Sequence, residues 1–587
     1  MKINFDANGF HVEPDGEGVQ FGDRPITPRK PRKQRTKTQL LVSNLLLTLL
    51  VALIKYYIEL PAINLKNPSF YGYFLFLSAF YCIISLLRGV GLEAIQNPKE
   101  LWKSVKDTCF VPAILCGALI LLFLVGNLIS APIFRAMAYS ELLRTEESSF
   151  TEDIDEISFD QIPMLDSTSA NNLSNRKLGE LSDLVSQFEV NGESYQINYN
   201  DHPVRVTFLN YGDFFKWLKN RSKGVPAYMV VDMVSQDVSV VRLSEGVRYS
   251  PSEYFFRFTD RYLRFKYPTL MFDDVNFEID EEGKPWWVAS VLTKRIGLFG
   301  GEDIIGAVLL NAVTGESEYY AAEDIPIWVD RAFTADLLTR QYDYYGMYHN
   351  GFINSLFTQS GCTRCTSGYN YIAQDDDVWM YTGITSVGGD ESNIGFILVN
   401  QRTKEAKYYA IAGAEEYSAM SSAEGAVQQY HYISTFPLLL NIEGQPTYFM
   451  ALKDASSLVK MYAMVNVQQY QIVATGATVA DCQQNYLQAL KKNKLVSEIS
   501  TIVPAVDPDA VTVEGTISEI RSAVVEGYTH FYLRVNGLWY DLSIADAPIA
   551  AILSVGDSVS LTVTEEDALL NTAVAVAVQE TTDSGKS

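Results

Sequence analysis

Histidine and cysteine, which supply much of the catalytic and metal-binding chemistry of proteins, are scarce in this chain. Its 587 residues include five histidines and six cysteines. The sequence contains no Gly-x-Ser-x-Gly elbow and no His-Glu-x-x-His helix. No catalytic residue, cofactor site or metal site follows from a motif, so we predict a protein without cofactor or bound metal and favour a non-catalytic role.

Basic residues are also in short supply. There are 46 Lys and Arg against 70 Asp and Glu, which gives a net charge of −24. Contacts with nucleic-acid phosphates need a surface rich in Lys and Arg, so we expect no nucleic-acid partner. One exception is the run RKPRKQRTK, from Arg29 to Lys37, which holds six basic residues and no acid.

Three long runs without any charge follow this basic arm. They extend over residues 40–54, 70–87 and 109–134. About 20 apolar residues cross the hydrocarbon core of a bilayer, so we predict three transmembrane helices within residues 40–135 and a lipid bilayer as partner. A cleaved signal peptide is not expected, because the first run begins some forty residues into the chain and no small-residue cleavage site follows it.

The distribution of Lys and Arg predicts the orientation in the membrane. The basic arm precedes the first run, and the loop after the second run carries Arg88, Lys99, Lys103 and Lys106. The loop between the first two runs holds only Lys66 beyond Lys55. Since cytoplasmic loops carry the excess of Lys and Arg, we predict a multi-pass cell-membrane protein with a cytoplasmic N-terminus and its C-terminal part outside the cytoplasm.

One pattern returns four times between residues 178 and 495. A turn introduces an aromatic strand, a β-branched strand follows, and a helical stretch ends the unit. The four aromatic strands read GVPAYMVVDM, GKPWWVASVL, DDVWMYTGIT and GQPTYFMALKD. We therefore predict about four repeated ββα units. Five aromatic residues are assigned to corresponding places in these copies and hence to core packing: Tyr228, Trp286, Trp287, Trp379 and Tyr448.

The glycine-rich stretch IGLFGGEDIIG follows the second aromatic strand. It lacks a Gly-Lys-Ser/Thr ending and precedes a strand instead of a helix, so we interpret it as a turn or bulge and not as a nucleotide site.

The turn NAVTGE in the second predicted repeat resembles a turn of a known family. Asn311, Thr314, Gly315 and Glu316 fill places comparable to the V-D-x-x-T-G-E-like turn of PepSY-like modules in bacterial envelope proteins. The order of helix, strand and hairpin is similar as well. This resemblance implies an extracytoplasmic binding or inhibitory module, and the chain as a whole resembles multi-span membrane proteins of bacteria.

The C-terminal segment alternates in the manner of short strands. Five expected strands and a short helical APIAAIL stretch resemble a small OB-like β-barrel. Two basic residues, Arg521 and Arg534, face nine acids there, which favours contact with protein over contact with nucleic acid.

The fold class that follows is a membrane-anchored α+β protein with three N-terminal transmembrane helices, repeated α/β units and a C-terminal OB-like barrel. The expected segments are a basic cytoplasmic arm (1–39), the transmembrane helices (40–135), an acidic tether (136–177), the repeated units (178–495), a linker (496–510), the barrel (511–579) and a disordered tail (580–587).

Cys362 and Cys365 form the motif CTRC between two glycine-containing turns. A zinc site needs about four ligands, and a second Cys-x-x-Cys motif is missing. The pair could be a local disulfide or redox couple, with Arg364 favouring a thiolate, or two ordinary thiols. The acidic stretches FDDVNFEIDEEG and QDDDVW lack the twelve-residue calcium-loop pattern and are interpreted as solvated turns.

These observations favour a membrane-anchored extracytoplasmic scaffold or binding protein, a subunit of an envelope or transport complex whose partners are other membrane or envelope proteins. The alternative is an envelope thiol-redox enzyme that uses Cys362 and Cys365. A third hypothesis is a glycan-processing enzyme with a carboxylate pair. The oligomeric state is left open.

Overall fold

A computed structural model describes the chain. The described residues are 2–6, 9–13, 37–89, 102, 106, 108–154, 162–200, 202–374, 377–388, 392–496, 511–525, 528–543, 550, 553–565 and 571–578. The chain divides into two compact units, Met1–Gly126 and Asn127–Ser587. Most of the basic run, Lys99, Lys103, nearly all of the expected linker and the tail at 580–587 lie outside the described residues.

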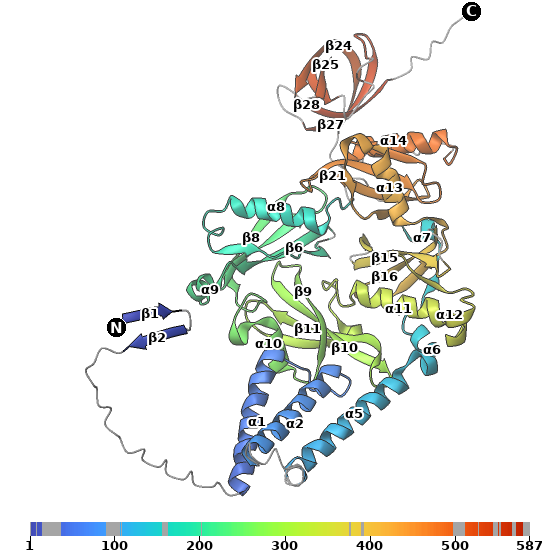
Figure 1. Cartoon of the computed structure of the whole chain (residues 1–587). Helices are drawn as coiled ribbons and strands as arrows, with labels where there is room; N and C mark the ends of the chain where they lie inside the picture. Colours follow the sequence, from blue (N-terminus) through green and yellow to red (C-terminus); the bar gives the residue numbers. More distant parts are fainter. Residues whose placement is uncertain are drawn as a thin grey trace, which may run out of the picture. The chain divides into compact units, whose positions relative to one another are not determined.

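The first unit contains long apolar helices. A short hairpin, β1 (Lys2–Asp6) with β2 (Gly9–Glu13), precedes α1 (Lys37–Glu59) and α2 (Pro68–Gly89), and α5 (Phe110–Ser130) continues into the second unit (Figure 1). Helices α1, α2 and α5 are each long and apolar enough to cross a membrane. This confirms the three predicted apolar spans, and it indicates membrane association.

Polar groups join α1 to α2 at two levels. The amide of Asn44 donates to Ser85 Oγ at 3.2 Å and accepts from Arg88 at 3.0 Å. Near the other end, the hydroxyl of Tyr73 donates to the carbonyl of Ala52 at 2.8 Å. Meanwhile many leucines of α1 stay more than half exposed, as expected for side chains that face lipid.

The described strands of the second unit form four sheets and a barrel. Sheet one contains β4 (Phe188–Val190), β5 (Tyr195–Asn198), β6 (Pro203–Tyr211), β7 (Val225–Asp232) and β8 (Val238–Val247). Sheet two contains β9 (Met271–Ile279), β10 (Pro285–Ile296), β11 (Gly300–Asn311) and β12 (Ser317–Ala321).

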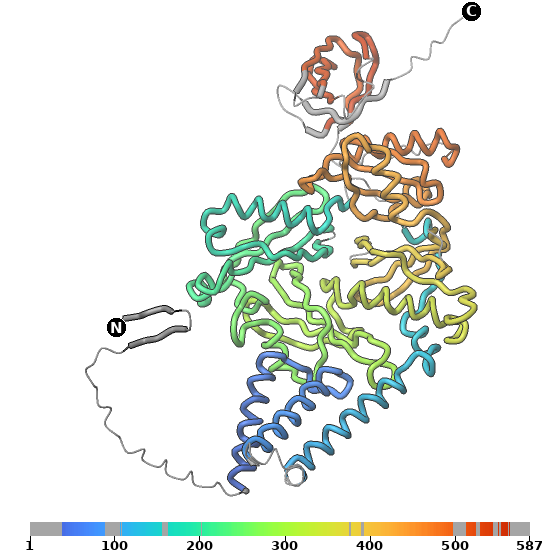
Figure 2. Tube along the Cα trace, viewed as in Figure 1, coloured from blue at the N-terminus to red at the C-terminus, as the bar shows by residue number. Residues whose placement is uncertain are grey.

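Sheet three contains β13 (Thr363–Cys365), β14 (Asn370–Gln374), β15 (Asp377–Ser386), β16 (Ser392–Asn400), β17 (Ala406–Tyr409), β18 (Gly413–Ala414) and a parallel edge strand, β3 (Glu146–Glu147). Sheet four contains β19 (Ile433–Ser434), β20 (Leu438–Ile442), β21 (Gln445–Lys453), β22 (Val459–Asn466) and β23 (Val473–Gly476). Figure 2 shows the trace passing through the four sheets in sequence order.

A helix precedes the strands of each sheet. These helices are α8 (Ser167–Gly179), α10 (Thr259–Lys266), α11 (Ala335–Tyr348) and α13 (Glu416–Ala426). Further helices are α6 (Pro132–Ser140), α7 (Phe150–Asp153), α9 (Phe214–Asn220), α12 (Phe352–Phe357) and α14 (Val479–Lys492). For each sheet the order is thus helix first and strands after it, whereas the predicted order was ββα.

Three buried clusters join neighbouring sheets. Trp287 of sheet two packs with Phe208 of sheet one, at 4.8 Å between ring centroids. On the other face of β10, Val288 packs with Met380 of sheet three. Sheet three and sheet four share the next cluster, which includes Phe396 and Tyr448. Because sheets two and three are covered on both faces, their central strands are almost continuously apolar.

The predicted correspondence of the five aromatic residues is wrong in part. In the pairing register, Trp286 lies opposite Asn311 and Trp379 lies opposite Asn400, so these two tryptophans are equivalent. In sheet four Thr447 lies opposite Asn466 and takes the matching position, so Tyr448 corresponds to Trp287. Tyr228, however, lies on β7, the strand after the equivalent of β10. The long β6–β7 connection, which contains α9, displaced the sequence alignment of the first predicted repeat by one strand.

Four of the five aromatic rings nonetheless pack in the core, as predicted. Trp287 is 0 % exposed, and its indole N–H donates to the carbonyl of Tyr249 at 2.7 Å. Tyr228, Trp379 and Tyr448 are also buried, whereas Trp286 is partly exposed. The glycine-rich stretch is the β10–β11 hairpin, as predicted, with Ile296 paired to Gly300.

The expected acidic tether at 136–177 is folded wherever the structure describes it. Besides α6, α7 and the start of α8, it contributes β3, whose Glu146 pairs with Lys407 of β17. Leu143, Phe150 and Ile162 are buried. Single large apolar residues, scattered without a period, anchor this segment, so its acidic composition misled the prediction.

The C-terminal strands close into a barrel. In sequence they are β24 (Val511–Val525), β25 (Tyr528–Val535), β26 (Leu538–Ser543), β27 (Ser558–Glu565) and β28 (Asn571–Val578). Around the barrel the order is β24-β25-β26-β28-β27, with β26 and β28 parallel. Leu533, Leu542 and Leu561 fill the interior. Only Ala550 and Leu553 of the APIAAIL stretch are described.

Candidate functional site

A cavity of about 210 Å³ opens where sheets one, three and four meet. Its wall includes Gln196 and Arg205 of sheet one, Tyr371 of sheet three and Met450 of sheet four. At roughly 30 Å³ per water molecule, this volume would hold several waters or one small organic group. Aromatic and methionine side chains make up much of the remaining wall.

Arg205 supplies a positive charge to this wall. It lies on β6 directly opposite Gln196 of β5 and is only 8 % exposed. Its guanidinium donates to the carbonyls of Leu165 and Ser194, at 3.3 and 3.2 Å, and to Oε1 of Gln196 at 3.4 Å. All three acceptors are neutral, and no carboxylate of the described residues lies within ion-pair distance of Arg205.

Burial, followed by the like charge of Arg331, lowers the pKa of Arg205 to about 10. The guanidinium therefore stays charged at neutral pH, and a charge held in a protein interior without an opposite partner is costly. The buried Nε2 of Gln196, which also lines the cavity, donates to no acceptor in the structure. The cavity thus presents both a charge and a hydrogen-bond donor that an anionic group could satisfy.

The wall also holds a carboxylate, that of Asp166, which is already engaged. Asp166 caps α8 by accepting the backbone N–H of Ser169 at 2.9 Å, and it pairs with Lys453 at 2.6 Å. Burial acts to raise the pKa of Asp166, but the hydrogen bonds from Lys453 and Ser169 outweigh it and hold that pKa below its ordinary value. Asp166 is thereby a partner of Lys453 rather than a direct counter-ion of Arg205.

A second guanidinium, that of the half-buried Arg331, lies against Tyr371 of the cavity wall. Arg331 donates to the hydroxyl of Tyr371 at 3.1 Å and lies 5.1 Å from the centre of that ring and 5.9 Å from the ring of Tyr195. Glu278 accepts the backbone N–H of Asp330 at 2.9 Å and that of Arg331 at 3.2 Å. Burial raises the pKa of Glu278 to about 7 despite these donors, so its charge is only partly developed near neutral pH.

The chemistry of this wall suits an anionic group. A charged, planar guanidinium recognises carboxylate and phosphate groups, and the apolar wall would accept the body that carries them. The sequence held one signal that could have identified Arg205. In PVRVTFLNY a charged residue interrupts a continuous apolar strand, which is where a buried polar group is costly and needs a reason.

The structure does not bring the sulfurs of Cys362 and Cys365 together. Both are free thiols. Cys362 Sγ lies 3.6 Å from the carbonyl of Met347, and Cys365 Sγ lies 3.8 Å from that of Thr339. These carbonyls are eight residues apart in α11, hence about 12 Å along the axis, while a disulfide needs about 2 Å between its sulfurs.

The surroundings of the two thiols also oppose a thiolate. Burial raises the pKa of both Cys362 and Cys365, and the nearby carboxylate of Asp343 adds to the effect at Cys365. Arg364, which we expected to favour a thiolate, is exposed between them. Thiol exchange by this pair remains a prediction without a supporting contact.

The prediction of solvated turns is wrong for much of the two acidic stretches, because residues 272–279 belong to β9, where Glu278 is buried, and Asp377 is buried at the start of β15. In the first, Asp280 accepts backbone N–H groups of Glu282 and Lys284 across the β9–β10 turn. In the second, Asp375 and Asp376 lie outside the described residues, and Asp377 pairs with Arg402 at 2.6 Å. No group of three or more His, Cys, Asp or Glu that could hold a metal occurs among the described residues.

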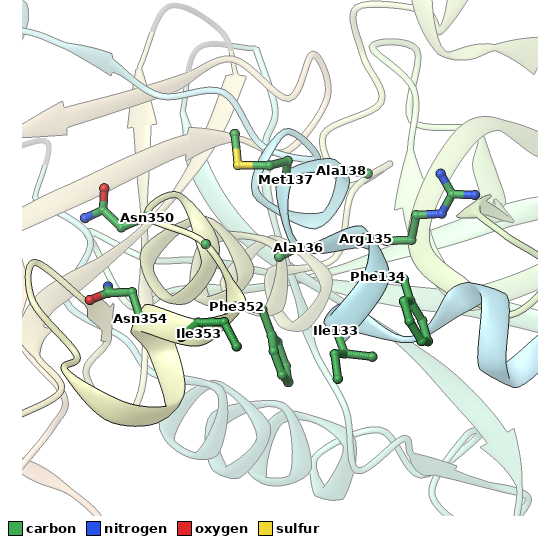
Figure 3. A pocket seen from close by; sticks show the side chains of 11 residues that line it. Ile133, Phe134, Arg135, Ala136, Met137, Ala138, Asn350, Phe352, Ile353 and Asn354 are labelled. Carbon is green, nitrogen blue, oxygen red and sulfur yellow. The ribbon is translucent and has the colours of Figure 1, made fainter.

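A second, more open pocket of about 550 Å³ lies between α6 and the start of α12. Figure 3 shows Ile133 and Phe134 of α6 beside Phe352 and Ile353 of α12, with Arg135 pointing away from that group. Since Ile133, Phe134 and Ile353 are all more than half exposed, this pocket is an apolar surface depression and lacks the buried charge of the Arg205 cavity.

No protein-family model matches the chain, and no curated protein matches it in sequence.

Proposed function

We propose that this chain is a membrane-anchored scaffold or binding protein whose second unit lies outside the cytoplasm, and that the Arg205 cavity receives an anionic group of its ligand or partner. The observation that carries the proposal is the buried guanidinium of Arg205, which lines a cavity and contacts only neutral acceptors. A binding protein explains this cost, because a bound anion would compensate the charge.

The four sheets support a repeated binding module. Each has a hairpin between its third and fourth long strands, which begins with an Asp or Asn whose Oδ1 accepts backbone N–H groups two or three residues further on. These residues are Asp232, Asn311, Asn400 and Asn466. With a helix before every set of strands, this common turn favours four copies of one PepSY-like unit.

The barrel and the charge distribution support the remaining parts of the proposal. Five strands, closed with one parallel contact between β26 and β28, are consistent with an OB-like barrel. Its excess of acids favours a protein as partner. Lys and Arg before α1 and after α2 favour a cytoplasmic N-terminus, so the second unit, which follows the third span, would lie outside.

Ligand-dependent stability tests the cavity. The full chain in lipid nanodiscs is heated with benzoate or with benzamide, its neutral isostere. We expect benzoate to raise the melting temperature of the wild type and of Arg205→Lys, and to leave Arg205→Met unchanged. Equal shifts with benzamide, or a benzoate shift that survives in Arg205→Met, would contradict an anion site at Arg205.

Partner capture and labelling test the rest. Gentle crosslinking in the native membrane should recover the same envelope proteins with the wild type and with Cys365→Ser; loss of partners or of an activity in Cys365→Ser would favour the thiol-redox alternative.

For orientation, cysteines replace the exposed Ser456 and Thr38. An impermeant reagent should label Ser456→Cys on intact cells and Thr38→Cys only after lysis, above the background of the native cysteines. The reverse result would overturn the orientation.

A further inference from the structure

A basic and aromatic surface stands out on this acidic chain. Residues 213–223 and 253–266 together hold eight Lys or Arg and three acids. They also expose large apolar side chains, among them Phe215 at 78 % and Phe256 at 65 %. The aromatic-basic face, as we call it here, consists of Phe214, Phe215, Leu218, Tyr254, Phe255, Phe256 and Phe265 with the Lys and Arg of these two segments other than the buried Arg264.

Ring contacts make this face continuous. Phe214 of α9 lies 5.2 Å from Tyr254, and Trp217 lies 5.8 Å from Phe255, at the start of the short 3-10 helix Phe255–Arg257. Phe256 reaches Phe265 of α10 at 6.1 Å. One guanidinium joins the two segments, because Arg257 donates to the carbonyl of Arg221. Within the second segment, Arg261 donates to the carbonyl of Phe255.

A rigid base holds the rings outward. Beneath them, the buried carboxylate of Glu253 accepts the indole N–H of Trp217 at 2.7 Å and the hydroxyl of Tyr211 at 2.8 Å. Phe255 has a φ of +58°, a left-handed conformation that is unfavourable for a phenylalanine. The fold thus maintains local strain and exposes a large apolar ring, a combination that marks interaction surfaces.

The pairing of sheet two places this face at one particular end of that sheet. The hydroxyl oxygen of Ser130, the last residue of α5, accepts the backbone N–H groups of Leu298 and Phe299 at the tip of the β10–β11 hairpin. The face lies toward the opposite end of the same sheet. Tyr249, which leads into it, donates its backbone N–H to the carbonyl of Ala312, and Tyr262 and Lys266 donate to the carbonyls of Gly315 and Ser317, beyond the end of β11.

We propose that the aromatic-basic face rests on an anionic phospholipid surface. Aromatic rings prefer the headgroup level of a bilayer, where Lys and Arg reach the phosphates while their aliphatic stems cover apolar surface. Anionic lipids attract a cluster of cations even on a protein whose net charge is strongly negative, because the attraction is local. The face and the end of α5, at opposite ends of sheet two, would then both meet the membrane.

Site-specific quenching in nanodiscs tests this contact on the full chain. Phe215→Cys carries an environment-sensitive fluorophore, and a nitroxide on the lipid headgroup is the quencher. The matched control is Tyr470→Cys, an exposed aromatic position in the β22–β23 turn outside the face. The signal of the native cysteines, measured on the unmutated protein, is subtracted. We expect several-fold stronger quenching at position 215 than at 470, and stronger quenching in discs with phosphatidylglycerol than with phosphatidylcholine alone.

A charge variant separates lipid contact from simple exposure. Lys216→Glu with Lys219→Glu, in the Phe215→Cys background, should remove the dependence on phosphatidylglycerol while the melting temperature stays close to that of the parent. Equal quenching at positions 215 and 470 overturns the proposal. So does a probe at 215 that lipid does not quench and that only an added membrane-protein extract protects, since that result assigns the face to a protein partner.

Discussion

Gln196 and Arg205 lie directly opposite each other on β5 and β6, with Oε1 of the amide 3.4 Å from the guanidinium. The pair satisfies one donor of Arg205 and leaves the amide nitrogen of Gln196 without an acceptor. Both side chains line the cavity between three sheets. A cross-strand contact that would be ordinary on a sheet surface here holds a charge inside the molecule.

Removing the charge of Arg205 should raise the stability of the ligand-free protein or leave that stability unchanged. Arg205→Met keeps much of the apolar stem and abolishes the cost of burying an uncompensated guanidinium. We expect its melting temperature to equal or exceed that of the wild type, with Arg205→Lys lower because its ammonium cannot reach all three acceptors. A strong loss of stability in Arg205→Met would instead identify the guanidinium hydrogen bonds as essential to the fold.

Trp287→Ala should be severely destabilising. The indole is fully buried, packs on Phe208 and Phe277, and donates to Tyr249. Truncation of such a ring costs about 3–5 kcal/mol. Trp286→Ala is the control, since Trp286 is partly exposed and should cost clearly less. Denaturant titration measures both, and equal losses would contradict a core role specific to Trp287.

The common hairpin turn predicts matched effects in two sheets. Asn311→Ala and Asn400→Ala each remove an acceptor of two backbone N–H groups. We expect a loss of about 1 kcal/mol for each hydrogen-bonding side chain, with similar size at the two sites and near-additivity in the double variant. Asn175→Ala, on the exposed face of α8, should change the free energy of unfolding much less. A large effect at only one turn would weaken the equivalence of the units.

Glu278 should make the stability depend on pH. Its pKa is raised from 4.5 to about 7, so the folded state binds more protons than the unfolded state between these values. The contribution is fully present below about pH 4.5 and is lost as the pH rises through about 7, with a total on the order of 3 kcal/mol. Melting temperatures of the wild type should therefore fall between pH 5.5 and 7.5 more steeply than those of Glu278→Gln. Parallel curves would refute this assignment.

The thiols of Cys362 and Cys365 should remain separate in the native protein. Cys362 is buried and Cys365 half-buried, each thiol lies against a different carbonyl of α11, and both pKa values are raised. We expect slow alkylation when the chain is folded and rapid alkylation of both after unfolding, followed by mass spectrometry of the peptides. A peptide with a Cys362–Cys365 disulfide from aerobically purified protein would restore the redox hypothesis and require the 359–365 segment to rearrange.

The sequence by itself determined the three apolar spans and the character of the strands. An uncharged run of about 20 residues has few alternatives to a span, and the alternation of rings with β-branched residues is a local property of a half-buried strand. The glycine-rich hairpin followed from the same local signals. Residue order also located four of the five aromatic core positions, but Trp286 is partly exposed and Tyr228 was assigned to the wrong strand.

Only the tertiary structure decided the packing of residues 136–177, the alignment of the first predicted repeat with the other three, and the Arg205 cavity. Leu143, Phe150 and Ile162 show no period, and each is buried by partners far away in sequence. The cavity likewise combines side chains of three sheets, from Gln196 to Met450. Local patterns report which face of an element is apolar, whereas a site between sheets depends on which faces meet, and long-range packing alone decides that.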